Sequence, residues 1–242
     1  MRVLLGISGA SGAVYGLRTG DVLLARGADL HVIVTSTAWR ILEAEAGTAP
    51  GPDVPRVGRP GGTGLPERKR WLAERMSVPR DSFRLHEEDD FLIPFASGSN
   101  PADATIIAPC SMGMLSRIAH GSSTSVLARC ADVAMKERRP LVVVPRETPL
   151  SVVHLENMLA LARAGADVLP ACPGFYHRPA TVAEMVDFVV SRILARIGID
   201  AELVPRWGEA ADRREKGGRG GRGKASAGRA AAGHPSGARR GE

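Results

Sequence analysis

The sequence predicts an α/β fold built on an open, doubly wound parallel sheet. Short apolar runs alternate with stretches of helical periodicity from residue 2 to residue 209. These runs are apolar along almost their whole length, which is typical of parallel strands covered by helices on both faces. The predicted arrangement is Rossmann-like or flavodoxin-like, so ligands are expected beyond the carboxyl ends of the strands.

The first two strands are expected near the N-terminus. Residues 3–7 (Val-Leu-Leu-Gly-Ile) form a short apolar run, and residues 12–25 repeat apolar side chains at helical spacing. Residues 30–35 form a second apolar run, and a helix is expected over residues 38–46. Each strand therefore leads into a helix, as a parallel sheet requires.

Three further strands are expected in the second half of the chain, each followed by helical residues. The strands are 104–108, 141–144 and 166–169. The helices after them are 112–119 and 126–137, then 150–164, then 182–197. This alternation predicts one domain over residues 1–209.

The composition agrees with a globular protein. Of 242 residues, 44 % are hydrophobic and 24 % are charged, which is ordinary for a folded domain. No apolar run approaches the roughly 18 residues that a membrane-spanning helix needs. Gly6 interrupts the N-terminal run too early for a signal peptide. Three cysteines are too few for a disulfide scaffold, so we expect a reduced, cytoplasmic protein.

The net charge of +6 comes entirely from the C-terminal residues. Residues 211–242 hold nine Lys or Arg and three Asp or Glu, so the rest of the chain is neutral. A neutral body argues against a nucleic-acid-binding domain. Residues 210–242 are rich in Gly, Ala and Arg and lack aromatic side chains, so we expect a disordered tail. Residues 47–64, rich in Pro and Gly, are expected to form a flexible insertion.

Small and hydroxyl-bearing residues follow the first two strands. Ser8-Gly9-Ala10-Ser11-Gly12 leads into a helix, whose free N–H groups are able to bind a phosphate. The loop lacks the GxGxxG pattern of dinucleotide sites, so phosphate binding and plain tight packing both stay open. Residues 35–37 (Thr-Ser-Thr) begin the next helix, where hydroxyls commonly serve as N-caps.

Charged residues collect after the strand at 141–144. Arg146 and Glu147 follow it, and they are expected either to meet ligand oxygens or to form a surface salt bridge. Arg and Lys are the side chains best suited to hold phosphate. Five cationic or phenolic groups could converge on one anion: Arg129, Lys136, Arg146, Tyr176 and Arg192.

Several common catalytic classes lack their motifs. The six histidines show neither HxxxH nor HExxH spacing, and Cys110, Cys130 and Cys172 form no CxxC pair. GxSxG and P-loop patterns are missing as well. The sequence therefore favours neither a metal site nor a hydrolase or NTPase.

Seven short segments form a series that spans nearly all of residues 2–209. They are 6–16, 96–99, 109–112, 131–141, 144–149, 154–159 and 173–176. In this order they resemble the flavin prenyltransferase family, the UbiX type. Residues 205–209 (Pro-Arg-Trp-Gly-Glu) are similar to one branch of that family. One such segment would say little, whereas seven in register are specific.

The resemblance implies an activity. Members of this family join the dimethylallyl group of dimethylallyl phosphate to N5 and C6 of reduced FMN and release phosphate, without a metal. The product, prenylated FMN, is the cofactor of UbiD-type decarboxylases. Members also assemble as dodecamers with their sites at subunit junctions. From the resemblance we expect the same substrates, partner and assembly for this chain.

The resemblance also implies roles for individual residues. The expected FMN-binding set is Gly9, Ala10, Ser11, Thr35, Ser111, Met112, Gly113, Met114 and Arg146. The set around dimethylallyl phosphate is Arg129, Lys136, Glu147, Tyr176 and Arg192. Glu45 would be the acid or base near N5, with Ser11, Lys136 and Glu147 also catalytic, and Trp207 would help close the site. Cleavage of the allylic C–O bond places negative charge on phosphate, which preorganised Arg and Lys stabilise.

Two other functions remain as alternatives. FMN-dependent cysteine decarboxylases share this fold, but they use an early histidine and a Pro-x-Met-Asn loop, where this chain has Pro-Cys-Ser-Met at residues 109–112. A non-catalytic flavin carrier would not need Arg129, Lys136 and Glu147 together. One departure from the family is the Ser-rich turn at residues 122–125, which replaces an Asn-rich turn and is expected to alter subunit contacts rather than chemistry.

Overall fold

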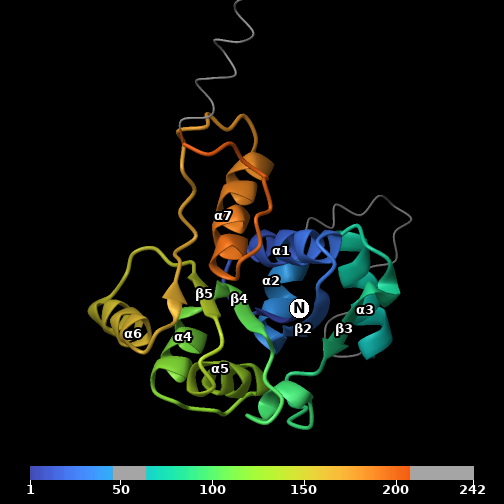
Figure 1. The fold of residues 1–242 in the computed structure, drawn as a ribbon, viewed down its shortest axis with the longest axis vertical. Coiled ribbons are helices and arrows are strands. Elements are labelled where there is room, and N and C mark those ends of the chain that lie inside the picture. The colour runs from blue at the N-terminus through green and yellow to red at the C-terminus, as the bar shows by residue number, and fades with distance from the viewer. Residues whose placement is uncertain (46–63, 208–242) are drawn as a thin grey trace, which may run out of the picture. The chain divides into compact units, whose positions relative to one another are not determined.

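A computed structural model describes residues 1–45 and 64–207 of the chain (Figure 1). The chain divides into two units, Met1–Val204 and Pro205–Glu242, and residues 205–207 are the described part of the second. The expected disordered tail and, apart from Gly64, the expected insertion at residues 47–64 lie outside the described residues. The architecture below is that of the first unit.

Six parallel strands form one open sheet, and the open parallel sheet agrees with the prediction, which had five of the six strands. They are β1 (Arg2–Ile7), β2 (Asp29–Val34), β3 (Phe83–His86), β4 (Ala104–Cys110), β5 (Leu141–Pro145) and β6 (Asp167–Val168), in the spatial order β3-β2-β1-β4-β5-β6. In this register Gly6 of β1 lies beside Ile33 of β2 and Ile107 of β4. The winding direction reverses between β1 and β4, so a crevice is expected beyond the carboxyl ends of these two strands.

Helices cover both faces of the sheet (Figure 1). One layer contains α1 (Ala13–Ala25), α2 (Ser36–Glu45), α3 (Leu65–Arg75) and α7 (Val182–Arg196); the other contains α4 (Met112–Ala119), α5 (Val126–Lys136) and α6 (Val152–Arg163). Neighbouring strand residues point to opposite layers, so Leu5 packs in the first core and Leu4 in the second.

Two glycines let helices approach the sheet closely near its carboxyl edge. A Cβ on Gly6 would lie 2.4 Å from Cδ1 of Leu127, so α5 packs directly on the β1 backbone. A Cβ on Gly16 would lie 2.3 Å from the carbonyl oxygen of Ala108, so α1 packs equally closely on β4. Both contacts place helix starts beside the expected crevice.

The expected elements are confirmed to within a few residues, and two further elements appear between residues 65 and 86. The helix α3 and the edge strand β3 had no counterpart in the prediction. Short 3₁₀ turns at Arg80–Ser82 and Pro94–Ala96 complete this region. No helix among the described residues is long and apolar enough to cross a membrane.

Candidate active site

A pocket of about 380 Å³ opens at the carboxyl ends of β1, β2 and β4. It is lined by Ser8, Gly9, Thr35, Ser36, Thr37, Glu88, Ser111, Gly113, Met114, Arg117, Thr124 and Ser125. The wall thus contains five members of the expected FMN-binding set: Gly9, Thr35, Ser111, Gly113 and Met114. The pocket lies where the strand order reverses, the usual ligand position in an open parallel sheet.

Three helices begin at this pocket, and hydroxyl groups fix their first turns. Thr35 Oγ1 accepts a hydrogen bond from the Ala38 N–H at 3.2 Å. The N-caps Ser111 and Ser125 accept in the same way from Met114 and Ala128 at the starts of α4 and α5. The same hydroxyls therefore cap the helices and line the pocket.

The first loop is fixed to its neighbours by Ser8 and Gly9. Ser8 Oγ donates to the Pro109 carbonyl at 3.1 Å and accepts from the Ser111 N–H at 2.8 Å, which joins the β1 loop to the β4 loop. A Cβ on Gly9 would lie 2.5 Å from Cγ2 of Thr37. A larger residue at position 9 would therefore displace the pocket wall.

Glu45, at the end of α2, holds the start of α1. Its carboxylate accepts from the Gly12 N–H at 3.0 and 2.9 Å and from the Ala13 N–H at 2.9 Å. Gly12 has φ of 101°, a left-handed conformation that glycine adopts without strain. The anion at this helix start is therefore the Glu45 carboxylate. The sequence had left phosphate binding at this loop open, and the structure gives that possibility no support.

Arg146 lies beside Gly12 and Tyr15. Its Cγ is 3.7 Å from the Cβ position of Gly12, and the Tyr15 ring is 3.1 Å from the same position. Burial raises the pKa of the Tyr15 phenol, Cys172 raises it further, and the Arg146 guanidinium opposes the rise. Arg146 Nε is buried without a hydrogen-bond partner among the described residues. A bound acceptor would satisfy that donor, so this position fits a polar ligand.

Arg129 and Lys136 form a second group on α5. Arg129 Nε donates to the Ala96 carbonyl at 3.1 Å, and its guanidinium pairs with Asp132 at 2.9 Å. Lys136 pairs with Glu137 beside Gly98. The structure therefore brings two expected phosphate-binding residues to the turn at residues 96–99.

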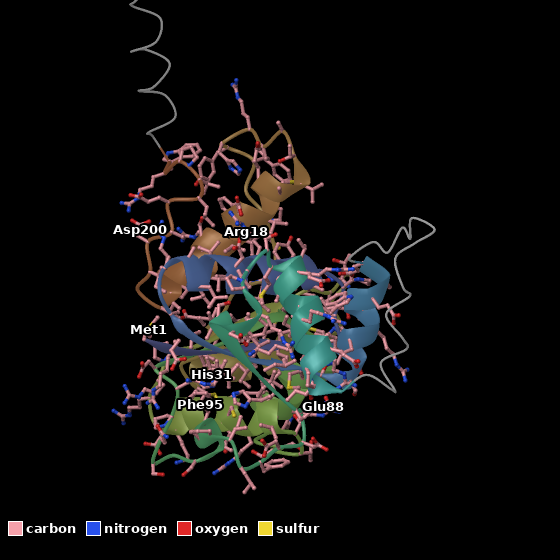
Figure 2. All side chains as sticks on the ribbon, turned by 90° about the vertical axis from the view of Figure 1, so that its right-hand side faces the viewer. Met1, Arg18, His31, Glu88, Phe95 and Asp200 are labelled. Carbon is pink, nitrogen blue, oxygen red and sulfur yellow. The ribbon has the colours of Figure 1, made fainter. Side chains whose placement is uncertain are left out.

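Tyr176 and Arg192 form a third group, beside β6 and α7. Arg192 lines a pocket of about 430 Å³ together with Cys172 and Phe188. The Tyr176 ring meets the Phe188 ring edge-on with centroids 5.8 Å apart. Arg18 of α1, labelled in Figure 2, holds α7 in place through Asp187, with Nε 2.7 Å from Oδ1.

The sequence matches the Flavoprotein family over residues 1–197. The flavin prenyltransferase UbiX of Pseudomonas aeruginosa is 43 % identical over 208 residues, which cover 86 % of this chain and 94 % of the relative. This chain belongs to the flavin prenyltransferases of the Flavoprotein family. The resemblance inferred from the seven segments is thereby confirmed.

Solved structures of this flavin prenyltransferase family have the same fold. A UbiX protein in complex with FMN and dimethylallyl pyrophosphate is 31 % identical, with a TM-score of 0.71 over 86 % of this chain and 97 % of that chain. A dodecameric, FMN-dependent UbiX-like decarboxylase from Escherichia coli O157:H7 is 34 % identical, with a TM-score of 0.69 over 86 % and 98 %.

The remaining expected flavin prenyltransferase residues lie outside these groups. Ser11 and Glu147 are exposed, and Glu147 accepts from the neighbouring Thr148 N–H at 3.0 Å. Ala10 and Met112 are buried beside the first pocket's loops rather than lining it. Trp207 belongs to the second unit, so its role stays a prediction of the resemblance.

Cys110 and Cys130 offer no nucleophile at the first pocket. Burial raises the pKa of both the Cys110 and the Cys130 thiol to about 12, which keeps them protonated near neutral pH. Over residues 1–45 and 64–207, no group of three His, Cys, Asp or Glu side chains is placed to hold a metal ion.

Seven pocket residues were not in the expected FMN set: Ser8, Ser36, Thr37, Glu88, Arg117, Thr124 and Ser125. The turn at residues 122–125, expected to affect subunit contacts rather than chemistry, supplies two of them. The hydroxyls of this turn lie at a helix start, as those of residues 35–37 do. That shared pattern could have identified Thr124 and Ser125 as pocket residues from the sequence. Glu88 and Arg117 carried no such signal, because they stand in a loop and within α4.

Proposed function

We propose that this chain joins the dimethylallyl group of dimethylallyl phosphate to reduced FMN and so makes prenylated FMN. The supporting observation is the hydroxyl-lined pocket at the β1/β4 reversal, which contains five of the nine residues expected to bind FMN. Its volume of about 380 Å³ lies in the range of small-molecule sites. The reaction is inferred from family membership, and the proposed site from the position and lining of this pocket.

The residues present fit FMN. Gly113 leaves backbone open to a planar ligand, and Thr35 and Ser111 offer hydroxyls. Arg146, outside the lining of this pocket, offers a buried Nε that has no partner among the described residues. When bound in reduced form, FMN supplies the nucleophilic N5 and C6 atoms. The chain's own part is to hold this ligand, to bind the second substrate and to exclude water, because water would trap an allylic cation as an alcohol.

The cationic residues act on the leaving group. As the allylic C–O bond breaks, negative charge grows on the departing phosphate. Fixed guanidinium and ammonium groups stabilise that charge more in the transition state than in the ground state. Arg129, Lys136 and Arg192 have this role in the proposal, with the Tyr176 hydroxyl as a further donor.

Glu45 is the proposed proton-handling group. Its carboxylate is tied to the first turn of α1 by three hydrogen bonds, so it is held in one orientation beside the Ser8–Gly12 loop. A carboxylate in a fixed position is an effective general base when the proton lies within hydrogen-bond reach. Glu147 stands at the end of β5 as a second carboxylate.

The proposed active unit is an assembly of several copies. Lys136 ends α5 before the start of β5, whereas Arg146 follows the end of β5, so a five-residue strand of about 16 Å separates them. The proposal places Lys136 at the departing phosphate and Arg146 at FMN, so a second copy is needed to bring both to one active site. On α6, the exposed side chains of Val152, Leu155 and Leu159 form an apolar stripe suited to such a contact. The dodecameric Escherichia coli relative supports this part of the proposal.

A UbiD-type decarboxylase is the proposed recipient of the product, and the cytoplasm the proposed compartment. The three cysteines are free thiols, which agrees with reducing conditions. The reaction is proposed to need no metal ion, so added chelator should leave the rate unchanged.

The test is an anaerobic incubation of the purified full chain with reduced FMN and dimethylallyl phosphate, followed by mass spectrometry of the released flavin. The proposal expects a flavin heavier by one C5 prenyl unit, which is missing when dimethylallyl phosphate is left out. The description of the Escherichia coli relative as a decarboxylase calls for a parallel assay of carbon dioxide release. Unmodified FMN together with carbon dioxide release would overturn the transferase function.

A further inference from the structure

The wall of the first pocket is rich in hydrogen-bond donors. The hydroxyls of Thr35, Ser111 and Ser125 each accept a backbone N–H, and their own protons meet no acceptor among the described residues. The hydroxyls of Ser36, Thr37 and Thr124 make no side-chain hydrogen bond within the same residues. Six O–H groups are thus available to a ligand that accepts and does not donate, and a phosphate dianion is such a group.

Two charged side chains line this pocket, and they have opposite signs. Arg117 projects from α4 and forms no ion pair within the described residues. Glu88 lies in the loop after β3 (Figure 2), where its carboxylate accepts from the Ser36 N–H at 2.8 Å. The Glu88 carbonyl also accepts from the Val126 N–H at 3.2 Å, so the residue is fixed between the starts of α2 and α5.

These charges act on a phosphate in opposite directions. A guanidinium offers a cation with several donors, which strengthens the binding of a phosphomonoester. A carboxylate held at the same wall repels the dianion and occupies one N–H donor of the α2 start. Both charges interact less strongly with the neutral ring and the ribityl chain of a flavin than with its phosphate.

We propose that Arg117 and Glu88 set the selectivity of this pocket for a phosphorylated flavin, Arg117 by attracting the phosphate of FMN and Glu88 by limiting its affinity. This inference rests on the proposed function, since it takes the pocket to be the FMN site. It adds a consequence specific to this chain. Removal of either charge changes FMN affinity, in opposite directions, and leaves riboflavin affinity unchanged.

The experiment is a fluorescence titration of the full chain with oxidised FMN and, separately, with riboflavin at fixed ionic strength. Arg117→Gln is expected to weaken FMN binding roughly tenfold, because one charge-assisted contact is lost. Glu88→Gln is expected to tighten FMN binding about threefold, because its amide oxygen still accepts from Ser36 while the repulsion disappears. Riboflavin should bind both variants as it binds the unmodified chain.

Arg70→Gln and Glu74→Gln are the matched controls, since both residues are exposed on α3. They should change neither affinity. A parallel change in FMN and riboflavin affinity, or an unchanged FMN affinity in both pocket variants, would overturn the inference. The two proposals are separable. If the unmodified chain makes prenylated FMN while the Arg117→Gln variant keeps full FMN affinity, the proposed function stands and only the role given to Arg117 is overturned.

A measurement on the unmodified chain covers the case in which a variant fails to fold. Inorganic phosphate should compete with FMN and leave riboflavin binding unaffected. Rising potassium chloride should likewise weaken FMN binding more than riboflavin binding, since salt screens the phosphate contact. Equal responses of the two flavins would contradict the proposed phosphate contact, and failure to bind either flavin would overturn the proposed function as well.

Discussion

Glu45 connects α2 to α1 through a single carboxylate. Glu45→Gln keeps one acceptor oxygen for the Gly12 and Ala13 N–H groups, so we expect a loss of about 1 kcal/mol in the free energy of unfolding, as for a weakened helix cap. The same change removes the proposed proton-handling group, and we expect prenylation to slow roughly a hundredfold. Urea unfolding and single-turnover product formation measure the two effects.

Glu43→Gln is the control for this variant, because Glu43 lies two residues before Glu45 on the same helix. It should retain both stability and rate. FMN affinity should persist in Glu45→Gln, because the change alters proton handling and leaves the residues that line the pocket intact. Full turnover in Glu45→Gln would rule out its role in proton transfer.

A pair of histidines between β2 and β3 makes stability depend on pH. His31 Nδ1 lies 2.8 Å from His86 Nε2, and His31 also meets Phe95 edge-on (Figure 2). Burial lowers the pKa of both rings, and for His86 the pKa falls from 6.5 to about 4, with the charge of His31 as a further cause. The folded state therefore binds fewer protons than the unfolded state between these two values.

The sign of the effect follows from this difference. At pH 7.5 both states carry neutral rings, and stability is at its full value. As pH falls below 6.5, the unfolded histidines take up protons first, so stability decreases until the pH reaches about 4. Urea midpoints at pH 7.5 and pH 5 should show a smaller drop in His86→Gln than in the unmodified chain. His120→Gln, at an exposed ring, should keep the full drop.

At the scale of residues, position along the chain predicted the pocket hydroxyls but not its charges. Thr35 and Ser111 directly follow strands, and parallel strands deliver such residues to one edge of the sheet. Arg117 stands within α4, and Glu88 follows a strand that the sequence did not reveal. Their approach to the pocket depends on tertiary packing, which a local pattern does not contain.

The packing of α5 on β1 depends on Gly6. In Gly6→Ala the new methyl would lie 2.4 Å from Cδ1 and 2.7 Å from Cδ2 of Leu127, so the helix or the side chain must shift. We expect a loss of about 1–3 kcal/mol in unfolding free energy, the usual effect of overpacking a core. Leu127→Ala alone leaves a cavity and is also destabilising.

The double variant tests whether this contact is the cause. Gly6→Ala with Leu127→Ala should be less destabilised than the sum of the two single variants, because the second change makes room for the first. Thermal unfolding of all three measures the coupling. Additive losses would show that the strain at Gly6 arises elsewhere.

Two elements escaped the prediction for physical reasons. In α3 six of eleven residues are charged, and the buried group is limited to Trp71, Leu72 and Ala73, which gives a weak helical pattern. The strand β3 has four residues, Phe-Arg-Leu-His, and pairs with β2 alone. An edge strand this short shows alternation over too few positions to stand out. The long apolar strands β1, β2 and β4 were predictable because helices cover both their faces.

At the scale of the whole molecule, the cationic residues of the proposed active site are separated. Arg129 and Lys136 meet the turn at residues 96–99, whereas Arg146 meets Gly12 and Tyr15. Within the described residues no hydrogen bond or ion pair joins these two groups. This division follows from the path of β5, which lies between Lys136 and Arg146 along the chain.

The last prediction tests whether two copies share one site. Lys136→Ala and Arg146→Ala should each abolish turnover, because Lys136 is proposed to stabilise the departing phosphate and Arg146 to hold FMN in the same active site. Co-expression of the two variants as mixed assemblies should restore activity, since roughly a quarter of the sites would combine an intact Lys136 from one copy with an intact Arg146 from another. The inactive control is an assembly in which every chain carries both Lys136→Ala and Arg146→Ala. If each site were built from one chain alone, mixed assemblies would stay as inactive as the single variants, because every chain in them would lack one of the two cations.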